Sequence, residues 1–298
     1  MVSKTLILVD GTAVLYRAFY AIPSLSTKSG KPTNAVFGFV RMLRQVAAAW
    51  SPTHWAVAFD GGLPEQRMAL QADYKAQRKP MPEALREQIP MVEEYLDCAG
   101  VARVRQAGQE ADDIMATFVS LAEPAAERIL LATGDKDMYQ LVNEKVRIVP
   151  VSGQQAGGVA MGPAEVMAKT GVGPGQIVEW LALTGDASDN IPGVPGIGGK
   201  TAARLLGQYG SLDSVWQHLD GVAGEKLRKA LDGNRDLIRK NVEMVRLRRD
   251  LDCALDWDRL KVGRPEIGRL LPFFEACEFH SMARELAEPS LFPEQAGV

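Results

Sequence analysis

The sequence lacks any long apolar stretch. None of its apolar runs reaches the roughly 20 residues that a membrane-spanning helix requires. Residues 1–9, which hold one lysine and a short apolar run, are also too short for a secretory signal. We therefore expect a cytoplasmic protein that does not contact a membrane.

Cysteine and histidine are scarce as well. Cys98, Cys253 and Cys277 are an odd number at wide spacing, which argues against a disulfide framework and against a zinc site. The three histidines are scattered and offer no catalytic pair. We interpret all six side chains as structural.

The whole chain has no large excess of positive or negative charge, but its charged residues are unevenly distributed. The 298 residues are 46% hydrophobic with a formal net charge of -3, which fits one large globular domain or two smaller ones. Residues 226–249 nevertheless hold nine Lys or Arg against three acids. Most such runs are solvated helical faces, and the alternative is a surface that docks a polyanion such as a nucleic acid.

Strand-like and helix-like apolar patterns alternate in the first half of the chain. Short continuous apolar runs, typical of strands buried on both faces, occupy residues 6–9, 55–59 and 129–132. Helical patterns occupy residues 34–50, 82–99 and 110–122. This order predicts an α/β fold with a central, mostly parallel sheet flanked by helices. A further short apolar run occupies residues 146–149, and a glycine-rich stretch follows at 153–158. The pattern of the remaining residues predicts helices almost throughout.

Carboxylates gather where these predicted strands end. Asp10, Asp60 and Asp135 fall at or within a few residues of a strand end, which is where open parallel sheets bind ligands. Any single aspartate there is most simply a helix cap or a turn residue. A set of them in one small volume would repel unless divalent cations lay between them. We therefore predict magnesium or manganese with a phosphate-bearing substrate.

A glycine-rich turn follows two more acids, Asp186 and Asp189. Gly193, Gly196 and Gly198 would let backbone N–H groups approach a phosphate at the start of a helix. A Walker A loop is disfavoured, because Val194 stands where that motif needs glycine and no apolar strand precedes it. A plain connecting turn remains the alternative.

Together these motifs resemble the 5' nuclease (flap endonuclease) superfamily, and within it the amino-terminal 5'-3' exonuclease domain of bacterial family A DNA polymerases. The likeness runs nearly end to end. The motifs that carry it are Leu8-Val9-Asp10-Gly11, Ala35-Val36-Phe37-Gly38-Phe39, Ala58-Phe59-Asp60, Tyr74-Lys75-Ala76-Gln77-Arg78, Glu110-Ala111-Asp112-Asp113, Gly134-Asp135-Lys136-Asp137, Leu183-Thr184-Gly185-Asp186-Ala187-Ser188-Asp189-Asn190 and Gly193-Val194-Pro195-Gly196-Ile197-Gly198-Gly199-Lys200-Thr201-Ala202.

The resemblance implies two divalent cations, Mg²⁺ or Mn²⁺, held by nine acids, none of which is replaced. One ion would be held by Asp10, Asp60, Glu110 and Asp112, and the other by Asp135, Asp137, Asp186 and Asp189. Asp112 and Asp113 would bridge the ions or act through water. Four of these acids, Asp10, Asp60, Asp112 and Asp135, are also the predicted catalytic carboxylates.

The resemblance also implies where DNA would bind. Residues 61–97 would form an arch, on which Lys75 and Arg78 would be catalytic cations. Arg67 and Lys79 would add positive charge to the arch, and the ring of Tyr74 would stack on a base. Arg17 would contact a phosphate. A helix-hairpin-helix type element over residues 185–207 would hold duplex DNA, and its predicted contacts are Gly193, Gly196, Gly198, Lys200 and Thr201, with a potassium ion on backbone carbonyls.

The implied organisation is an α/β metal-binding core at 1–170, a helical DNA-binding part at 171–288 and a tail or linker at 289–298. The implied activity is 5'-3' exonuclease and flap endonuclease cleavage of DNA in replication and repair, by a monomer associated with the bacterial nucleoid. Two other functions stay open: a noncatalytic, structure-selective DNA clamp and a PIN-type RNase. A stand-alone enzyme and a domain of a DNA polymerase both fit the sequence.

Overall fold

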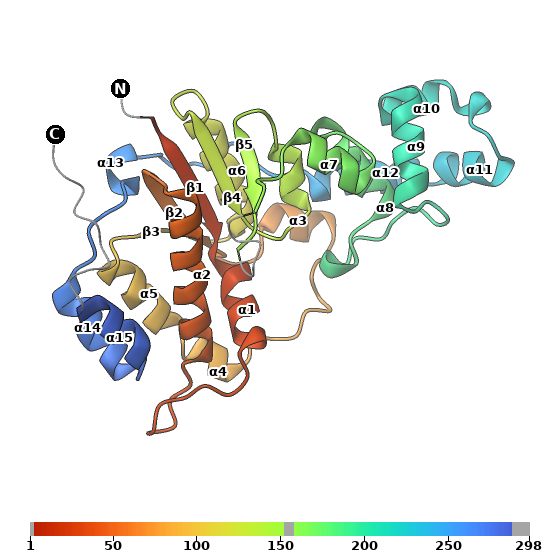
Figure 1. The fold of residues 1–298 in the computed structure, drawn as a ribbon. Coiled ribbons are helices and arrows are strands. Elements are labelled where there is room, and N and C mark those ends of the chain that lie inside the picture. Colours follow the sequence, from red (N-terminus) through yellow and green to blue (C-terminus); the bar gives the residue numbers. More distant parts are fainter. Residues whose placement is uncertain (1–2, 152–157, 288–298) are drawn as a thin grey trace.

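A five-stranded parallel sheet lies at the centre of the computed structural model, which describes residues 3–151 and 158–287 (Figure 1). The strand order is β3-β2-β1-β4-β5. The strands are β1 (Thr5–Asp10), β2 (His54–Phe59), β3 (Ala102–Arg105), β4 (Arg128–Ala132) and β5 (Val146–Val149). All four pairings are parallel, with Leu8 of β1 opposite Ala56 of β2 and Leu131 of β4. The carboxyl ends of the strands therefore meet along one edge.

The alternation of side chains along the strands separates two cores. On β1, Leu6 and Leu8 point into one apolar cluster, whereas Ile7 and Val9 point into the other. All four are at most 2% exposed. This double burial explains why the strand is a continuous apolar run rather than an alternating one.

Helices from both ends of the chain cover one face of the sheet. The core that contains Ile7 and Val9 is built from α1 (Gly11–Ala21), α2 (Asn34–Trp50) and α5 (Ile89–Cys98), together with α14 (Ile267–Ala276) and α15 (His280–Ala287). Phe274 is 1% exposed and lies against Tyr95 of α5. In Figure 1, α14 and α15 lie beside α5, far from the group of helices from α7 to α12.

A helical part extends from the opposite face, where α6 (Ala111–Ala122) covers the sheet. Its helices are α7 (Pro163–Thr170), α8 (Ile177–Thr184), α9 (Gly199–Tyr209), α10 (Leu212–Gln217), α11 (Glu225–Gly233) and α12 (Arg235–Val245). Asn241 of α12 is fully buried and donates to the carbonyl oxygens of Ala182 (2.9 Å) and Pro192 (2.7 Å). These bonds tie α12 to α8 and to the glycine-rich turn.

The predicted fold class is confirmed, with local differences. The predicted strands correspond to β1, β2, β4 and β5, while β3 was not predicted. The helical pattern at 82–99 is divided into α4 (Glu83–Arg86) and α5. Pro90 is the second residue of α5, a position in the first turn where proline favours the start of a new helix. Most of the stretch 153–158 and the tail 289–298 lie outside the described residues. Within the described ranges, no helix is long and apolar enough to span a bilayer.

One part of the predicted organisation differs from the structure. The sequence division assigned residues 171–288 to one helical part, but α13 (Trp257–Leu260), α14 and α15 pack on the α/β core. Val262 donates its backbone N–H to Thr53, beside β2. The apolar faces of α2 and α5 need cover on their outer side, and the last helices supply it.

Candidate active site

Two carboxylates occupy the edge where β1 and β2 end. Asp10 is the last residue of β1 and caps α1, accepting from the backbone N–H of Ala13 at 2.9 Å. Asp60 follows β2 directly and accepts from the backbone N–H of Ala111 at 2.8 Å. These bonds orient both side chains at the sheet edge, Asp10 through the start of α1 and Asp60 through the start of α6.

The first turn of α6 supplies one group of three acids. Ligand oxygens of Glu110, Asp112 and Asp113 lie within 4.8 Å of one another. Glu110 is 3% exposed and Asp113 is fully buried. The helix start favours negative charge, but three carboxylates there need further compensation.

A second group of three acids comes from two segments. Asp137, Asp186 and Asp189 also have ligand oxygens within 4.8 Å of one another, and all three are buried. Asp186 accepts from the Ser188 backbone N–H at 2.9 Å. Asp137 Oδ1 has no hydrogen-bond partner among the described residues. A buried carboxylate oxygen without a partner inside an acidic group is the environment that a hard divalent cation satisfies.

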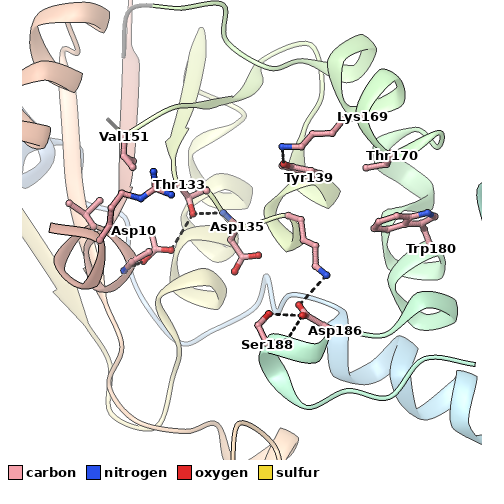
Figure 2. Close-up of a pocket in the computed structure, with 15 residues that line it drawn as sticks. Asp10, Thr133, Asp135, Tyr139, Val151, Lys169, Thr170, Trp180, Asp186 and Ser188 are labelled. Atoms are coloured by element: carbon pink, nitrogen blue, oxygen red, sulfur yellow. Dashed lines mark hydrogen bonds and ion pairs between the residues drawn. The ribbon is translucent and has the colours of Figure 1, made fainter. Parts of the chain in front are cut away.

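Asp135 lies beside the second group. Its Oδ1 accepts from the backbone N–H of Asp137 at 2.9 Å, and its own N–H donates to Thr133. The Thr133 hydroxyl in turn donates to Asp10 at 3.2 Å. Thr133 thus links the end of β1 with the loop after β4, as Figure 2 shows.

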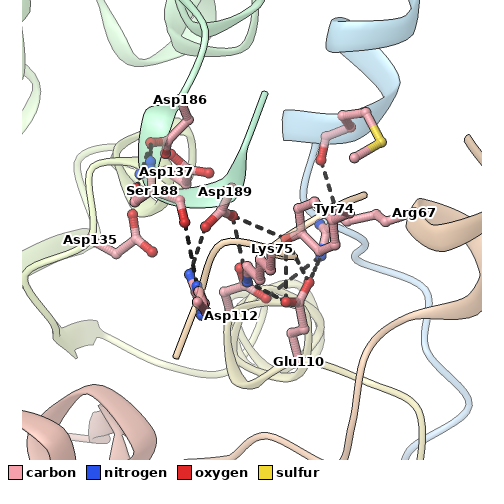
Figure 3. Close-up of polar contacts among 12 residues, drawn as sticks. Arg67, Tyr74, Lys75, Glu110, Asp112, Asp135, Asp137, Asp186, Ser188 and Asp189 are labelled. Carbon is pink, nitrogen blue, oxygen red and sulfur yellow. Dashed lines mark hydrogen bonds and ion pairs between the residues drawn. The ribbon is translucent and has the colours of Figure 1, made fainter. Parts of the chain in front are cut away.

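Two predicted catalytic cations reach into the acids from the segment after α3 (Glu65–Leu70). Lys75 Nζ contacts Glu110 and lies 3.5 Å from Asp189 Oδ2, and Arg78 Nη2 lies 2.6 Å from Asp189 Oδ1 (Figure 3). The backbone N–H of Lys75 also donates to the carbonyl of Asp189, and its φ is +56°. A non-glycine residue in this region of φ is uncommon, and the contacts to Asp189 hold it there.

Arg67 and Tyr74 do not lie where the resemblance placed them. Arg67 is 5% exposed and donates to Glu110 and Asp113 and to the carbonyl of Met244. Tyr74 is 3% exposed, and its hydroxyl donates toward Glu110 and Asp189. Neither side chain is an exposed feature of an arch, and burial of the Tyr74 ring leaves no face for a base.

Burial dominates the electrostatics of the acids. It raises the pKa of Asp10 to about 7, with Asp60 and Asp135 adding to the effect. Burial and neighbouring carboxylates also raise the pKa values of Asp112 and Asp137 well above the ordinary range. Burial opposes ionisation of Glu110 too, but Lys75 and Arg67 overcome it and lower its pKa. The site thus favours added positive charge.

Two cavities flank the acids. One of about 640 Å³ lies toward the helical part and is lined by Arg17, Lys136, Lys169 and Asp186 among others (Figure 2). The other, about 720 Å³, lies under the segment that carries Lys75 and Arg78. Three described residues line both, namely Asp10, Ala13 and Asp135. An extended polymeric ligand that occupied both cavities would pass over Asp10 and Asp135.

The glycine-rich turn lies between α8 and α9. A Cβ on Gly193 would come within 2.2 Å of the Thr184 carbonyl oxygen, so the close approach of the two segments requires glycine. Gly196 has φ +83°, and a Cβ on Gly198 would meet nothing within 4 Å. Gly198 precedes α9, which contains Lys200 and Thr201. Gly196 and Gly198 therefore present open backbone before the start of α9, whereas Gly193 is packed against Thr184.

Most of the basic run lies on α11 and α12, and Arg246, Arg248 and Arg249 follow α12. Several of its cations pair with acids on the same helix, such as Lys229 with Glu225 and Arg239 with Asp236. Arg235 and Arg239 also lie over the Trp216 ring, at 5.6 Å each. Exposed pairs of this kind are weak and leave the charges accessible.

Several site residues were not predicted from the sequence. Thr133 and Lys136 lie inside the motif that was singled out for its aspartates, and Lys136 Nζ is 3.5 Å from Asp186. Arg105, at the end of β3, lines the second cavity. Arg105 was not recognised from the sequence because β3, the strand that places it, was not predicted. Cys98, Cys253 and Cys277 are free thiols.

Comparisons with known proteins agree with this geometry. The sequence model of the 5'-3' exonuclease N-terminal resolvase-like domain matches residues 5–171, and that of the 5'-3' exonuclease C-terminal SAM fold matches residues 172–267. A 5'-3' exonuclease of Aquifex aeolicus is 34% identical over 283 residues, which are 95% of each chain. The thermostable DNA polymerase I of Thermus filiformis is 37% identical over 282 residues, 95% of this chain.

The chain spans about a third of the length of the DNA polymerase I relatives, 33% in the case of T. filiformis. Among solved structures, T5 5'-exonuclease with bound zinc has a TM-score of 0.65 at 23% identity, covering 96% of this chain and 100% of that one. The catalytic core of Rad2 in complex with DNA substrate has a TM-score of 0.65 at 17% identity, covering 95% and 92%. These two likenesses concern the fold. The two sequence models and the Aquifex relative show that the chain belongs to the 5'-3' exonuclease family.

Proposed function

We propose that the chain hydrolyses DNA phosphodiesters as a structure-specific 5' nuclease, both from a 5' end and at flap junctions, with two divalent cations. The observation that carries this proposal is the pair of acidic groups at the sheet edge. Each brings three carboxylates within 4.8 Å, and the oxygen of Asp137 without a partner fits a cation. A clamp without chemistry has no use for so much buried like charge.

The acids divide between the two ions as follows. We assign Asp10, Asp60, Glu110 and Asp112 to one ion, and Asp135, Asp137, Asp186 and Asp189 to the other, with Mg²⁺ or Mn²⁺ as the metal. Asp113 belongs to the site through its bond to Arg67, next to Glu110 and Asp112. When bound, the two cations would polarise the scissile phosphate, generate a hydroxide and stabilise the leaving 3' oxygen.

The side chains around the acids would position the substrate. Lys75 and Arg78 hold positive charge beside Asp189, where it can stabilise charge that grows on the phosphate. Arg17 lines the cavity on the helical side, where it can bind a backbone phosphate. The scissile phosphate would lie over Asp10 and Asp135, which line both cavities.

The remaining parts would grip the DNA on either side. We propose that residues 61–97 act as an arch over the single strand and that residues 185–207 act as a helix-hairpin-helix element. In the latter, Gly193, Gly196, Gly198, Lys200 and Thr201 would contact a duplex phosphate, with K⁺ on backbone carbonyls. The α/β core, the helical part and the tail at 289–298 would work as a monomer in the cytoplasm, at the nucleoid. Primer and flap removal is the matching role, alone or linked to a polymerase.

Two other functions fit fewer of the observations. A PIN-type RNase would share the sheet and the acids, but the helical part with its glycine-rich turn suits duplex DNA. A noncatalytic clamp would use that turn and the basic helices α11 and α12, yet it would leave Lys75 and Arg78 without a role.

The test is cleavage of a 5'-labelled double-flap DNA and its all-RNA counterpart, in Mg²⁺, in Mn²⁺ and in EDTA. We expect metal-dependent cutting of the DNA near the junction, lost in Asp135→Asn. Asp252→Asn, a change at an exposed aspartate outside the acidic groups, is the matched control and should cut normally. Binding of the flap without product in either metal would leave the clamp as the better account, and faster cutting of the RNA would favour the RNase.

A further inference from the structure

The cavity under the arch has an outer wall that the proposed mechanism does not use. Arg105 ends β3, and its guanidinium lies 5.4 Å from the centroid of the Phe59 ring. Both residues line the same cavity as Asp60, which follows Phe59 in the chain. A partly exposed guanidinium, at the end of the edge strand β3, thus forms part of the wall of this cavity.

Two tyrosines of α1 line the same cavity. The rings of Tyr16 and Tyr20 are stacked with centroids 6.5 Å apart, and Tyr20 is 68% exposed. A large aromatic ring so exposed on the cavity wall is unusual for packing alone, and it offers a face on which a base can stack. The cavity therefore combines aromatic rings with a cation beyond the acids.

We propose that this end of the cavity is a subsite for one unpaired nucleotide on the 5' side of the scissile phosphate, and that Arg105 binds the phosphate of that nucleotide. The inference rests on the proposed function, because the direction of the strand follows from it. The base would lie against Tyr16 or Tyr20, and the guanidinium would meet the phosphate oxygens through paired N–H donors.

The position of Arg105 is held by its neighbours. Its Nη1 lies 3.2 Å from Glu93 of α5, which fixes one side of the planar guanidinium. An arginine has five N–H donors, so one such contact leaves others able to bind an anion. With 45% of the Arg105 side chain exposed, solvent and ligand can reach it.

Arg103 provides a natural comparison. It lies two residues earlier on β3, pairs with the same Glu93 at 3.4 Å and is exposed to a similar degree, 39%. Arg103 also pairs with Asp97, and it is not among the described residues that line the cavity. Replacing one or the other arginine removes the same charge from the same strand, but only Arg105 faces the proposed subsite.

The bound phosphate could be the terminal phosphate of a 5' end or an internal phosphodiester of a longer flap. Three double-flap DNAs separate these sources: a one-nucleotide flap with a 5'-phosphate, the same flap with a 5'-hydroxyl, and a five-nucleotide flap with a 5'-hydroxyl. The first offers a terminal phosphate at the subsite, the second offers none, and the third offers an internal one.

The experiment measures kcat/KM in Mg²⁺ and Kd in EDTA for wild type, Arg105→Gln, Arg105→Lys and Arg103→Gln. For Arg105→Gln we expect kcat/KM to fall about fivefold to tenfold on the flaps that carry a phosphate at the subsite, with a matching rise in Kd. The 5'-hydroxyl one-nucleotide flap should change less than about twofold. Arg105→Lys should recover part of the loss, and Arg103→Gln should match wild type.

The outcomes separate this inference from the proposed function. If wild type cleaves none of the flaps, the proposed function itself is wrong. If wild type cleaves them and Arg105→Gln loses the same factor on all three, or behaves as Arg103→Gln does, the subsite is overturned. A loss only on the five-nucleotide flap assigns the subsite to internal phosphodiesters, and a loss only on the 5'-phosphate flap assigns it to 5' ends.

Discussion

The guanidinium of Arg67 donates one hydrogen bond to each carboxylate oxygen of Asp113, both at 2.9 Å, and Asp113 is fully buried. The same guanidinium contacts Glu110 and bonds to the carbonyls of Met244 and Arg246, at the end of α12. One buried cation therefore joins the first turn of α6, the start of the predicted arch and the helical part. Its role is to neutralise the acids and to fix their positions.

Arg67→Met should be strongly destabilising, because it leaves the fully buried Asp113 without its cation and removes one of the two cations that contact Glu110. Breaking a buried pair on one side costs about 3–5 kcal/mol, so we expect the free energy of unfolding to fall by roughly that amount. Urea unfolding in EDTA measures it. Arg44→Met, which breaks the exposed pair with Glu285, is the control and should cost less than about 1 kcal/mol. Equal effects of the two changes would contradict the role of Arg67.

Lys75→Met should slow catalysis more than it weakens binding. Lys75 lies within 3.5 Å of Asp189 and contacts Glu110, so it stands at the reacting centre rather than along the DNA path. We expect the single-turnover rate to fall by about 10²–10³, the effect of removing one positioned electrostatic group. Lys145→Met, at an exposed site, should leave the rate unchanged. A purely structural Lys75 would instead show normal rates once the variant is folded.

In EDTA, stability should fall as pH rises from about 5 to 8. Burial raises the pKa of Asp10 from 3.8 to about 7, so the folded state keeps a proton that the unfolded chain has lost in this window. The raised pKa values of Asp112 and Asp137 act in the same direction. Glu110 acts in the opposite direction, but its lowered pKa places that effect below this range.

The melting temperature at pH 5, 6, 7 and 8 tests this, with an expected fall in EDTA of roughly 5 °C or more. Mg²⁺ should add more stability at pH 8 than at pH 5, because the ions compete with protons for the same oxygens. Asp10→Asn should flatten the EDTA profile. A melting temperature that rises with pH in EDTA would contradict the assignment.

Substitutions at two glycines of the turn should have different effects, one on stability and the other on DNA binding. Gly193→Ala should lower stability, since its Cβ would lie 2.2 Å from the Thr184 carbonyl oxygen. Gly198→Ala should leave stability within about 0.5 kcal/mol, because its Cβ meets nothing, yet it should weaken duplex binding by filling the space a phosphate would enter. Thermal unfolding and anisotropy with duplex DNA measure the two effects. Unchanged binding in Gly198→Ala would remove this turn from the proposed interface.

Much of the sheet and the acid set could be predicted from the sequence, for identifiable reasons. Strands buried on both faces leave continuous apolar runs, and Asp10 and Asp60 stand directly at their ends. β3 could not be found this way. It is a four-residue edge strand in which Arg103 and Arg105 alternate with small apolar residues, a pattern too short to distinguish from a loop.

The roles of Arg67 and Tyr74 were out of reach of the sequence for another reason. The position of the Arg67 side chain depends on a hydrogen bond to Met244, 177 residues away. The position of the Tyr74 side chain depends on a hydrogen bond to Asp189, 115 residues away. Spacing along the chain carries no information about such contacts. Family likeness placed both side chains on an exposed arch, whereas the density of buried charge drew them inward.

The packing of α14 and α15 on α2 and α5 has a consequence for the order of folding during synthesis. Phe274 and Phe279 belong to the same core as Val9 of β1, so the N-terminal strand and the last helices complete one another. Contacts of such high sequence separation form slowly and leave apolar surface open until α14 and α15 have been synthesised. The emerging chain should depend on chaperone cover until residues up to Met282 have left the ribosome, although its first strands were made long before.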